Sequence, residues 1–142
     1  MSRIEQLRSA FNAIHILPLE RENAEAILEL AQLVVDIDGG EGTEEIALFF
    51  AIGKLLFELA EAPDTPVPTF ASHEDDDERL FDLATQLKST ETRELAFAVA
   101  RTLAEADLEI VAAEETFIQR LRSLLSISKE RADELDTLLR SA

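Results

Sequence analysis

The chain has 142 residues, of which 46% are hydrophobic, and its 30 acidic and 13 basic residues give a formal net charge of −17. A chain of this length forms one domain that buries about two-thirds of its unfolded surface. The charge argues against nucleic-acid binding, which requires a basic surface, and favours cations or basic partner proteins.

Hydrophobic periodicity predicts three helices before the middle of the chain. The first is expected at about residues 3–13. The second, at about 20–37, has apolar residues at i, i+3, i+4 and i+7 and a wider apolar arc than one stripe, so we interpret it as central and mostly enclosed. It ends in the acidic, glycine-rich segment 38–42, whose glycines supply the positive φ of a tight turn. The third helix, at about 43–60, is apolar nearly all round.

A proline-rich stretch, residues 62–71, divides the chain near its middle. We interpret it as an extended linker between two halves that share a core, because each half is too small to be stable alone. Four helices are predicted after it, and the second of them is alanine-rich and is expected to be the other central helix. Their expected bounds are about 72–88, 91–106, 112–125 and 126–140.

Hydroxyl side chains are predicted to cap three of these four helices. Ser72 opens the first of them, whose apolar side is expected to include Phe81 with its leucines. Ser89 or Thr90 caps the second. The final helix of the chain is capped by one of two serines, Ser126 or Ser128.

The two halves repeat each other at an offset of 69 residues. Asp38 falls on Asp107, and Glu45 falls on Glu114. Each half has a buried-looking helix that ends at an Asp, a short acidic turn, and a second helix that opens at a Glu seven residues after that Asp. The repeat predicts two helix–turn–helix junctions of the same design.

Together these patterns predict an all-α fold of about seven helices. No stretch shows sustained two-residue alternation, so no sheet is expected. We predict a single helical domain over residues 1–142, with half-repeats at about 1–61 and 72–142 packed around two central helices.

The first junction resembles the TerB-like family, which includes the tellurite-resistance protein TerB and the N-terminal domain of the DjlA co-chaperones. The family pattern is Ala-x-Ala-Asp-Gly-x-apolar-Ser/Thr-x-x-Glu. Asp38-Gly39 and Glu45 match it, whereas Glu41 and Gly42 replace the apolar residue and the Ser or Thr. The resemblance covers roughly residues 24–125.

The second junction also resembles this pattern. The run 104–107, Ala-Glu-Ala-Asp, matches its start, and Ile110 and Glu114 match its apolar position and its Glu. Leu108 stands for the usual Gly and Val111 for the cap residue, which disfavours a tight left-handed turn there. The resemblance implies an all-helical bundle associated with tellurite resistance or stress, a possible metal site at the acidic motif, and no catalytic activity.

The acidic residues of the two junctions are the candidate metal ligands. Carboxylates at a helix–helix turn are hard oxygen ligands that suit Ca²⁺, Mg²⁺ or Mn²⁺. A structural interpretation is also open, and it is the commoner one, because acids at helix starts satisfy backbone amides and the helix dipole. The candidates are Asp38, Glu41, Glu45, Asp107 and Glu114, with Asp36 and Glu105 as further members.

Two functions are consistent with these residues. The first is a non-enzymatic TerB-like module that binds a protein partner with a basic surface or acts as a scaffold in a stress response, with a divalent cation at its acidic turns. The alternative is a metal-dependent hydrolase that uses the turn carboxylates. The hydrolase is the weaker hypothesis, because no nucleophile or general base is evident, and His15 and His73 have no ligand spacing.

The remaining charged and apolar features give two further expectations. The basic clusters Arg120/Arg122 and Lys129/Arg131 are expected to form exposed ion pairs within the molecule, each contributing about 0–1 kcal/mol. No apolar run approaches the ~20 residues of a membrane span, and the first residues lack a signal-peptide core. We therefore expect no membrane insertion and a cytoplasmic location. The absence of cysteine excludes disulfides, thiolate catalysis and zinc ribbons.

Overall fold

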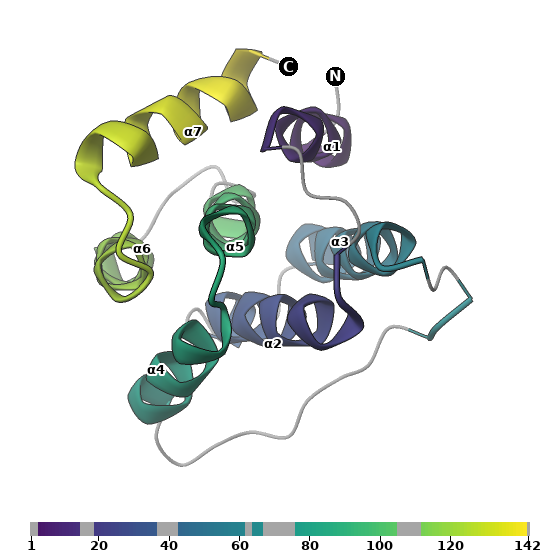
Figure 1. Ribbon diagram of the computed structural model, residues 1–142, viewed down its shortest axis with the longest axis horizontal. Coiled ribbons are helices and arrows are strands. Elements are labelled where there is room, and N and C mark those ends of the chain that lie inside the picture. The colour runs from purple at the N-terminus through teal and green to yellow at the C-terminus, as the bar shows by residue number, and fades with distance from the viewer. Residues whose placement is uncertain are drawn as a thin grey trace.

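The computed structural model describes residues 3–14, 19–36, 43–61, 64–66, 76–104 and 112–141 (Figure 1). In these ranges the chain forms seven helices and no strand, which confirms the predicted all-α fold. No helix in them combines the length and the apolar character needed to cross a bilayer. The helices are α1 (Arg3–Ile14), α2 (Arg21–Asp36), α3 (Thr43–Leu59), α4 (Asp76–Gln86), α5 (Thr90–Ala104), α6 (Ala112–Leu124) and α7 (Lys129–Ser141).

The two central helices are α2 and α5, which pack against each other. Figure 1 shows α5 end-on in the middle of the molecule with other helices around it. In α5 every residue from Leu95 to Ala100 is at most 2% exposed. Successive residues point about 100° apart around a helix, so such a run means that the helix is covered on all sides. Residues 26–31 of α2 form an equivalent buried run.

The outer helices exchange between the halves. The helix after each central helix stays with it, so α3 packs on α2 and α6 packs on α5. The helix before each central helix packs on the central helix of the other half, so α1 packs on α5 and α4 packs on α2. Each of them also packs on the outer helix of its own half, α1 on α3 and α4 on α6. If α1, α2 and α3 are exchanged with α4, α5 and α6, these helix pairs remain the same set. The arrangement explains why the halves share one core: each lends a helix to the other.

The last helix, α7, packs on α1 and α5 (Figure 1). The turn before it is closed by Ser126, whose φ of 59° is left-handed. The amide of Ile127 donates to the carbonyl of Arg122 at 3.1 Å, and the amide of Ser126 donates to that of Ser123 at 3.1 Å. These two bonds form a Schellman motif, which ends α6.

The structure distinguishes between the alternative helix caps. The Ser89 hydroxyl accepts from the amide of Thr92 at 3.2 Å, and the Ser128 hydroxyl accepts from the amide of Arg131 at 3.1 Å. Ser89 therefore caps α5 and Ser128 caps α7, in each case at the third residue after the cap. Ser72 lies outside the described residues, so its predicted capping role is not tested.

Among the described residues, the large apolar side chains that lie at the surface are Ile46, Phe50 and Phe81. Phe81 was expected on the apolar side of its helix, and this expectation is wrong. It is 57% exposed, because it shares the face of α4 that carries exposed Glu78 and Thr85, three residues before it and four after it. Ile46 and Phe50 of α3 are each 40% exposed, so part of this apolar helix faces solvent.

Candidate functional site

The predicted acidic junctions connect each central helix to the outer helix that stays with it. α2 ends at Asp36 and α3 begins at Thr43, while α5 ends at Ala104 and α6 begins at Ala112. The two junctions therefore occupy equivalent places in the exchanged arrangement of helices. This equivalence follows from the helix order and from the packing of α3 on α2 and α6 on α5.

The structure does not place the candidate ligands relative to one another. Asp38, Glu41 and Asp107 lie outside the described residues. Glu45 and Glu114 belong to the first turns of α3 and α6, and their side chains are not described. Within the described side chains, no three His, Asp or Glu residues gather closely enough to hold a metal ion. The metal site at the junctions stays a prediction. The two histidines and Glu105 also lie outside the described ranges.

A buried glutamate on α2 holds α4. Glu29 is largely buried, and its carboxylate accepts two hydrogen bonds from Arg79 of α4, one from Nε to Oε2 and one from Nη2 to Oε1 at 2.6 Å. Such a two-point contact fixes the orientation of the two side chains as well as their distance. The carboxylate raises the pKa of Arg79 above its ordinary value, mainly through the hydrogen bond and against the desolvation that lowers it.

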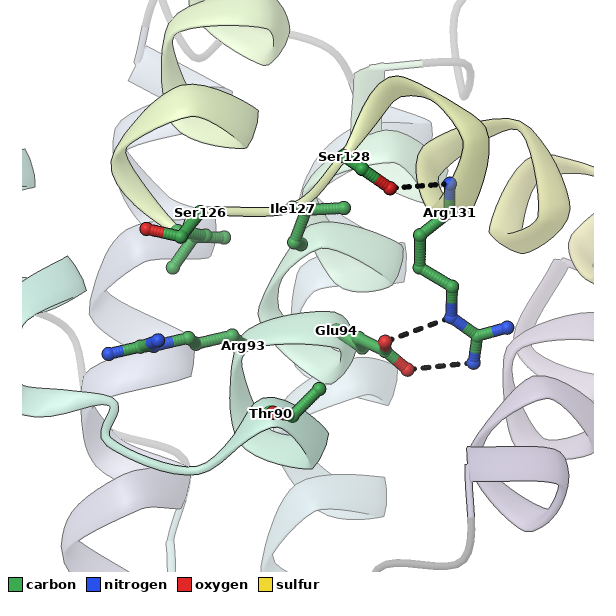
Figure 2. A pocket seen from close by; sticks show the side chains of 8 residues that line it. Thr90, Arg93, Glu94, Ser126, Ile127, Ser128 and Arg131 are labelled. Carbon is green, nitrogen blue, oxygen red and sulfur yellow. Dashed lines mark hydrogen bonds and ion pairs between the residues drawn. The ribbon is translucent and has the colours of Figure 1, made fainter.

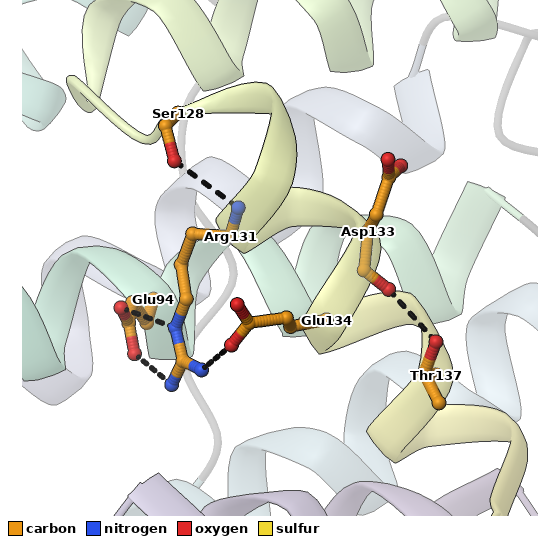
Figure 3. A network of polar contacts seen from close by, with 6 residues as sticks. All are labelled: Glu94, Ser128, Arg131, Asp133, Glu134 and Thr137. Carbon is orange, nitrogen blue, oxygen red and sulfur yellow. Dashed lines mark hydrogen bonds and ion pairs between the residues drawn. The ribbon is translucent and has the colours of Figure 1, made fainter.

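A second buried glutamate, on α5, holds α7. Glu94, with 9% of its side chain exposed, accepts from Arg131 Nε at 2.9 Å and from Arg131 Nη2 at 2.8 Å. Figure 3 shows the third guanidinium nitrogen of Arg131 pointing to Glu134, whose Oε2 lies 2.8 Å from it. The pKa of Arg131 is raised above its ordinary value, first by the hydrogen bond to Glu94 and then by the one to Glu134.

A further arginine connects α5 to α7, seven residues or about two helical turns after Glu94 in α5. Arg101 Nε and Asp136 Oδ1 lie 3.4 Å apart, and both side chains are mostly buried. Together with the Glu94–Arg131 pair, this contact gives the α5–α7 interface two charged contacts. Charged pairs at two points fix both the rotation and the register of α7 on α5.

An open pocket of about 220 Å³ lies between the start of α5 and the turn that joins α6 to α7 (Figure 2). Glu94 and Arg131 line it as a bonded pair, and Arg93 donates from Nε to the carbonyl of Leu87 at 2.7 Å. The pocket is smaller than the roughly 300–1,000 Å³ typical of sites for drug-sized ligands. Its lining contains no histidine, and its carboxylate is occupied by an arginine, so it lacks a nucleophile–base pair.

The buried glutamates were not predicted. The basic residue Arg131 was expected to form exposed ion pairs, and this expectation is wrong for its partner Glu94, which is buried. A signal was present in the sequence: Glu29 stands between two leucines in a helix predicted to be enclosed. A buried carboxylate requires a cationic or hydrogen-bonding partner, but which arginine supplies it depends on packing between distant segments.

Comparisons with models of protein families, with curated proteins and with solved structures find no match. The resemblance to the TerB-like family therefore rests on the two junction motifs. It enters the account of function as a proposal.

Proposed function

We propose that this chain is a non-enzymatic, TerB-like helical module that binds a protein partner with a basic surface, as a cytoplasmic scaffold in a tellurite or stress response, with a divalent cation at its acidic turns. The resemblance of the junctions supports the family and the response. The binding of the arginines to groups within the molecule supports a partner with a basic surface.

The observation that carries the proposal is that seven arginines of the described part of the chain bind groups of the same molecule. Each of the seven contacts a carboxylate, a backbone carbonyl or an amide oxygen in its own helix, in another helix or in a turn. Arginine presents five donors and prefers such fixed contacts, so its charge is neutralised by its partner or held in one position. The residues are Arg8, Arg21, Arg79, Arg93, Arg101, Arg122 and Arg131.

Exposed carboxylates lie on α1 to α5 and on α7 among the described side chains. Some of them are paired, as Glu58 is with Arg8, but the 30 acidic residues of the chain outnumber the 13 basic ones and leave a net charge of −17. A surface of this kind attracts basic proteins and speeds their association, and this attraction weakens as salt rises. The exposed members include Glu22, Asp82, Glu91, Glu130 and Asp133.

A basic peptide tests the partner chemistry directly. The probe is a labelled amphipathic peptide of about 14 residues, roughly four helical turns, with leucine on one face and lysine elsewhere. We expect a Kd of about 10 µM near physiological salt, rising several-fold when NaCl increases from about 50 to about 300 mM. The matched control is the same peptide with glutamate in place of lysine. Fluorescence anisotropy measures both, and equal or absent binding of the two peptides contradicts the proposal.

Thermal unfolding tests the cation. Ca²⁺, Mg²⁺, Mn²⁺ and Zn²⁺ are each compared with NaCl at matched ionic strength, because any salt screens a net charge of −17. A specific ion at ~100 times its Kd adds about 2.7 kcal/mol, which is roughly 8 °C in Tm for a domain of this size. Asp38→Asn and Asp107→Asn are expected to abolish the shift. Asp64→Asn, at an exposed position of the linker, is the charge-matched control and is expected to leave it intact.

If wild type and all three variants follow the NaCl curve, the turn acids do not bind a cation. The carboxylates are then structural. The peptide-binding experiment tests the basic partner independently of the cation.

A further inference from the structure

The outer face of α3 carries an exposed apolar patch made of Ile46, Ala47 and Phe50, which we name the α3 patch. Ile46 and Phe50 lie one helical turn apart and are each 40% exposed, and Ala47 beside them is exposed. The ring of buried Phe49 packs edge-on against Phe50, with centroids 5.6 Å apart and planes at 76°. This contact holds the Phe50 ring in one orientation at the surface.

The repeat supplies an internal comparison for this patch. At the offset of 69 residues, Ile46, Ala47 and Phe50 fall on positions 115, 116 and 119 of α6, which are Glu, Thr and Gln. The buried positions between them correspond, since Phe49 falls on Ile118 and both are buried. Thr116 and Gln119 are exposed, like their counterparts in α3.

The exposed face is thus common to both helices, but only α3 makes it apolar. The packing of the fold does not demand an apolar residue there, because the equivalent face of α6 is polar. Single exposed apolar residues are common on protein surfaces, whereas two at i and i+4 form the kind of stripe that another helix covers.

The charge around the patch indicates what covers it. The ten residues before Ile46 contain five carboxylates and no basic residue, whereas the exposed Lys54 follows Phe50 by one helical turn at the other end of the patch. A second copy of the chain would bring another net charge of −17 against this end of α3, which electrostatic repulsion disfavours. A basic partner would be attracted to the same place.

We infer that the α3 patch docks an amphipathic helix of a basic partner protein. The apolar stripe of that helix covers Ile46 and Phe50, and its lysines or arginines are attracted by the net charge of −17 of the chain. The inference rests on the proposed function, and adds to it the docking face and the helical, apolar-and-basic character of the partner.

The test uses the lysine–leucine peptide described above, the full-length chain and two matched pairs of variants. Phe50→Gln introduces the residue that α6 has at the equivalent position, and Phe81→Gln makes the same change at an exposed phenylalanine of α4. Ala47→Arg adds bulk and positive charge to the patch without removing any packed side chain, and Thr116→Arg makes the same charge change at the equivalent position of α6. Circular dichroism and Tm establish that each variant is folded.

Phe50→Gln and Ala47→Arg are expected to weaken peptide binding at least about tenfold, while Phe81→Gln and Thr116→Arg stay within about twofold of wild type. If wild type binds the peptide and all four variants bind it equally well, attraction is spread over the acidic surface. The docking face is then wrong, although the proposed function survives. If wild type does not bind the peptide, both fail.

Analytical sedimentation of the chain without peptide tests the alternative that a second copy of the chain covers the α3 patch. We expect a monomer for wild type and for Ala47→Arg. A wild-type dimer that Ala47→Arg dissociates, with Thr116→Arg still dimeric, would show that the patch is an interface between two copies and would overturn the basic partner.

Discussion

Glu25 on α2 and Glu94 on α5 occupy equivalent positions of the repeat, 69 residues apart, but they lie in opposite environments. The side chain of Glu94 is 9% exposed and is bound by Arg131 of α7, whereas that of Glu25 is 47% exposed and pairs with Arg21 one turn earlier in its own helix. The difference follows from α7, which packs on α5. One glutamate in the repeat is thereby buried and paired across an interface.

Loss of the arginine at this interface should destabilise the fold. Arg131→Met leaves the Glu94 carboxylate buried without its cation, and we expect a loss of about 2 kcal/mol in unfolding free energy. This is less than the roughly 3–5 kcal/mol of fully buried pairs, because the Arg131 side chain is 35% exposed and solvent screens it. Adding Glu94→Gln should recover most of the loss. Urea denaturation measures both variants.

Arg21→Met is the matched control for that experiment. Its pair with Glu25 is exposed, so we expect a change below about 0.5 kcal/mol. Equal losses from Arg131→Met and Arg21→Met would show that burial of the α5–α7 pair contributes nothing.

The stabilisation from Arg131 should not depend on pH in the neutral to alkaline range. Its pKa is raised above its ordinary value by the hydrogen bonds to Glu94 and then to Glu134. A raised pKa means that the stabilisation is fully present below the ordinary value and is lost only when the pH passes the folded-state value. The difference in unfolding free energy between wild type and Arg131→Met should therefore be the same at about pH 7 and about pH 10.

Arg131→Lys provides the contrast, because lysine has an ordinary pKa of about 10.4. We expect this variant to keep its stability relative to wild type up to about pH 10, and to lose it as the pH rises further, because the pairing with Glu94 is fully present below the ordinary pKa of lysine. A parallel pH profile for the two proteins would contradict this account of the interface.

The two-point contact between Arg79 and Glu29 should not tolerate lysine. Arg79→Lys keeps the positive charge but cannot donate to both carboxylate oxygens in the same fixed geometry, so we expect a loss of about 1 kcal/mol. Arg8→Lys, in the exposed pair with Glu58, should change stability by less than about 0.5 kcal/mol. Hydrogen exchange should show the loss as faster exchange in α4. A uniform change across all helices would argue against a local role in holding α4.

The left-handed residue before α7 offers a stabilising substitution. Ser126 has a φ of 59°, where a side chain is costly and glycine is not, so Ser126→Gly should raise the unfolding free energy by about 0.5–1 kcal/mol. The same change at Ser123, inside α6, should lower it by about 0.5–1 kcal/mol. Thermal unfolding distinguishes them by the sign of the shift in Tm, and a fall in both variants would contradict the Schellman closure.

Much of the helical layout could be predicted from the sequence. The seven helices follow from hydrophobic periodicity. The enclosure of α2 was predicted from its wide apolar arc, and that of α5 from its alanine-rich interior. The structure then decided between neighbouring hydroxyl residues, assigning the caps to Ser89 and Ser128. The acidic junction residues stay a prediction, because the structure does not describe their side chains.

The partners of the buried glutamates could not be predicted, and neither could the exposure of Phe50 and Phe81. The sequence around Glu94 and Glu25 does not show which of the two will be buried. The same is true of Phe49, which is buried, and Phe50, which is exposed. Coverage depends on which helix comes to lie on that face, and α7 and α5 meet through contacts 37 residues apart in the chain.

The sequence by itself determined where the helices form and which two are enclosed, because helical periodicity, turns and caps depend on residues within a few positions of one another. Only the tertiary structure decided that each half lends its first helix to the other, that α7 covers Glu94 while Glu25 stays exposed, and that α3 presents Ile46 and Phe50 at the surface. The physical reason is that a side chain is buried by atoms from distant segments, and the choice among possible helix pairings is made by the packing of the whole core.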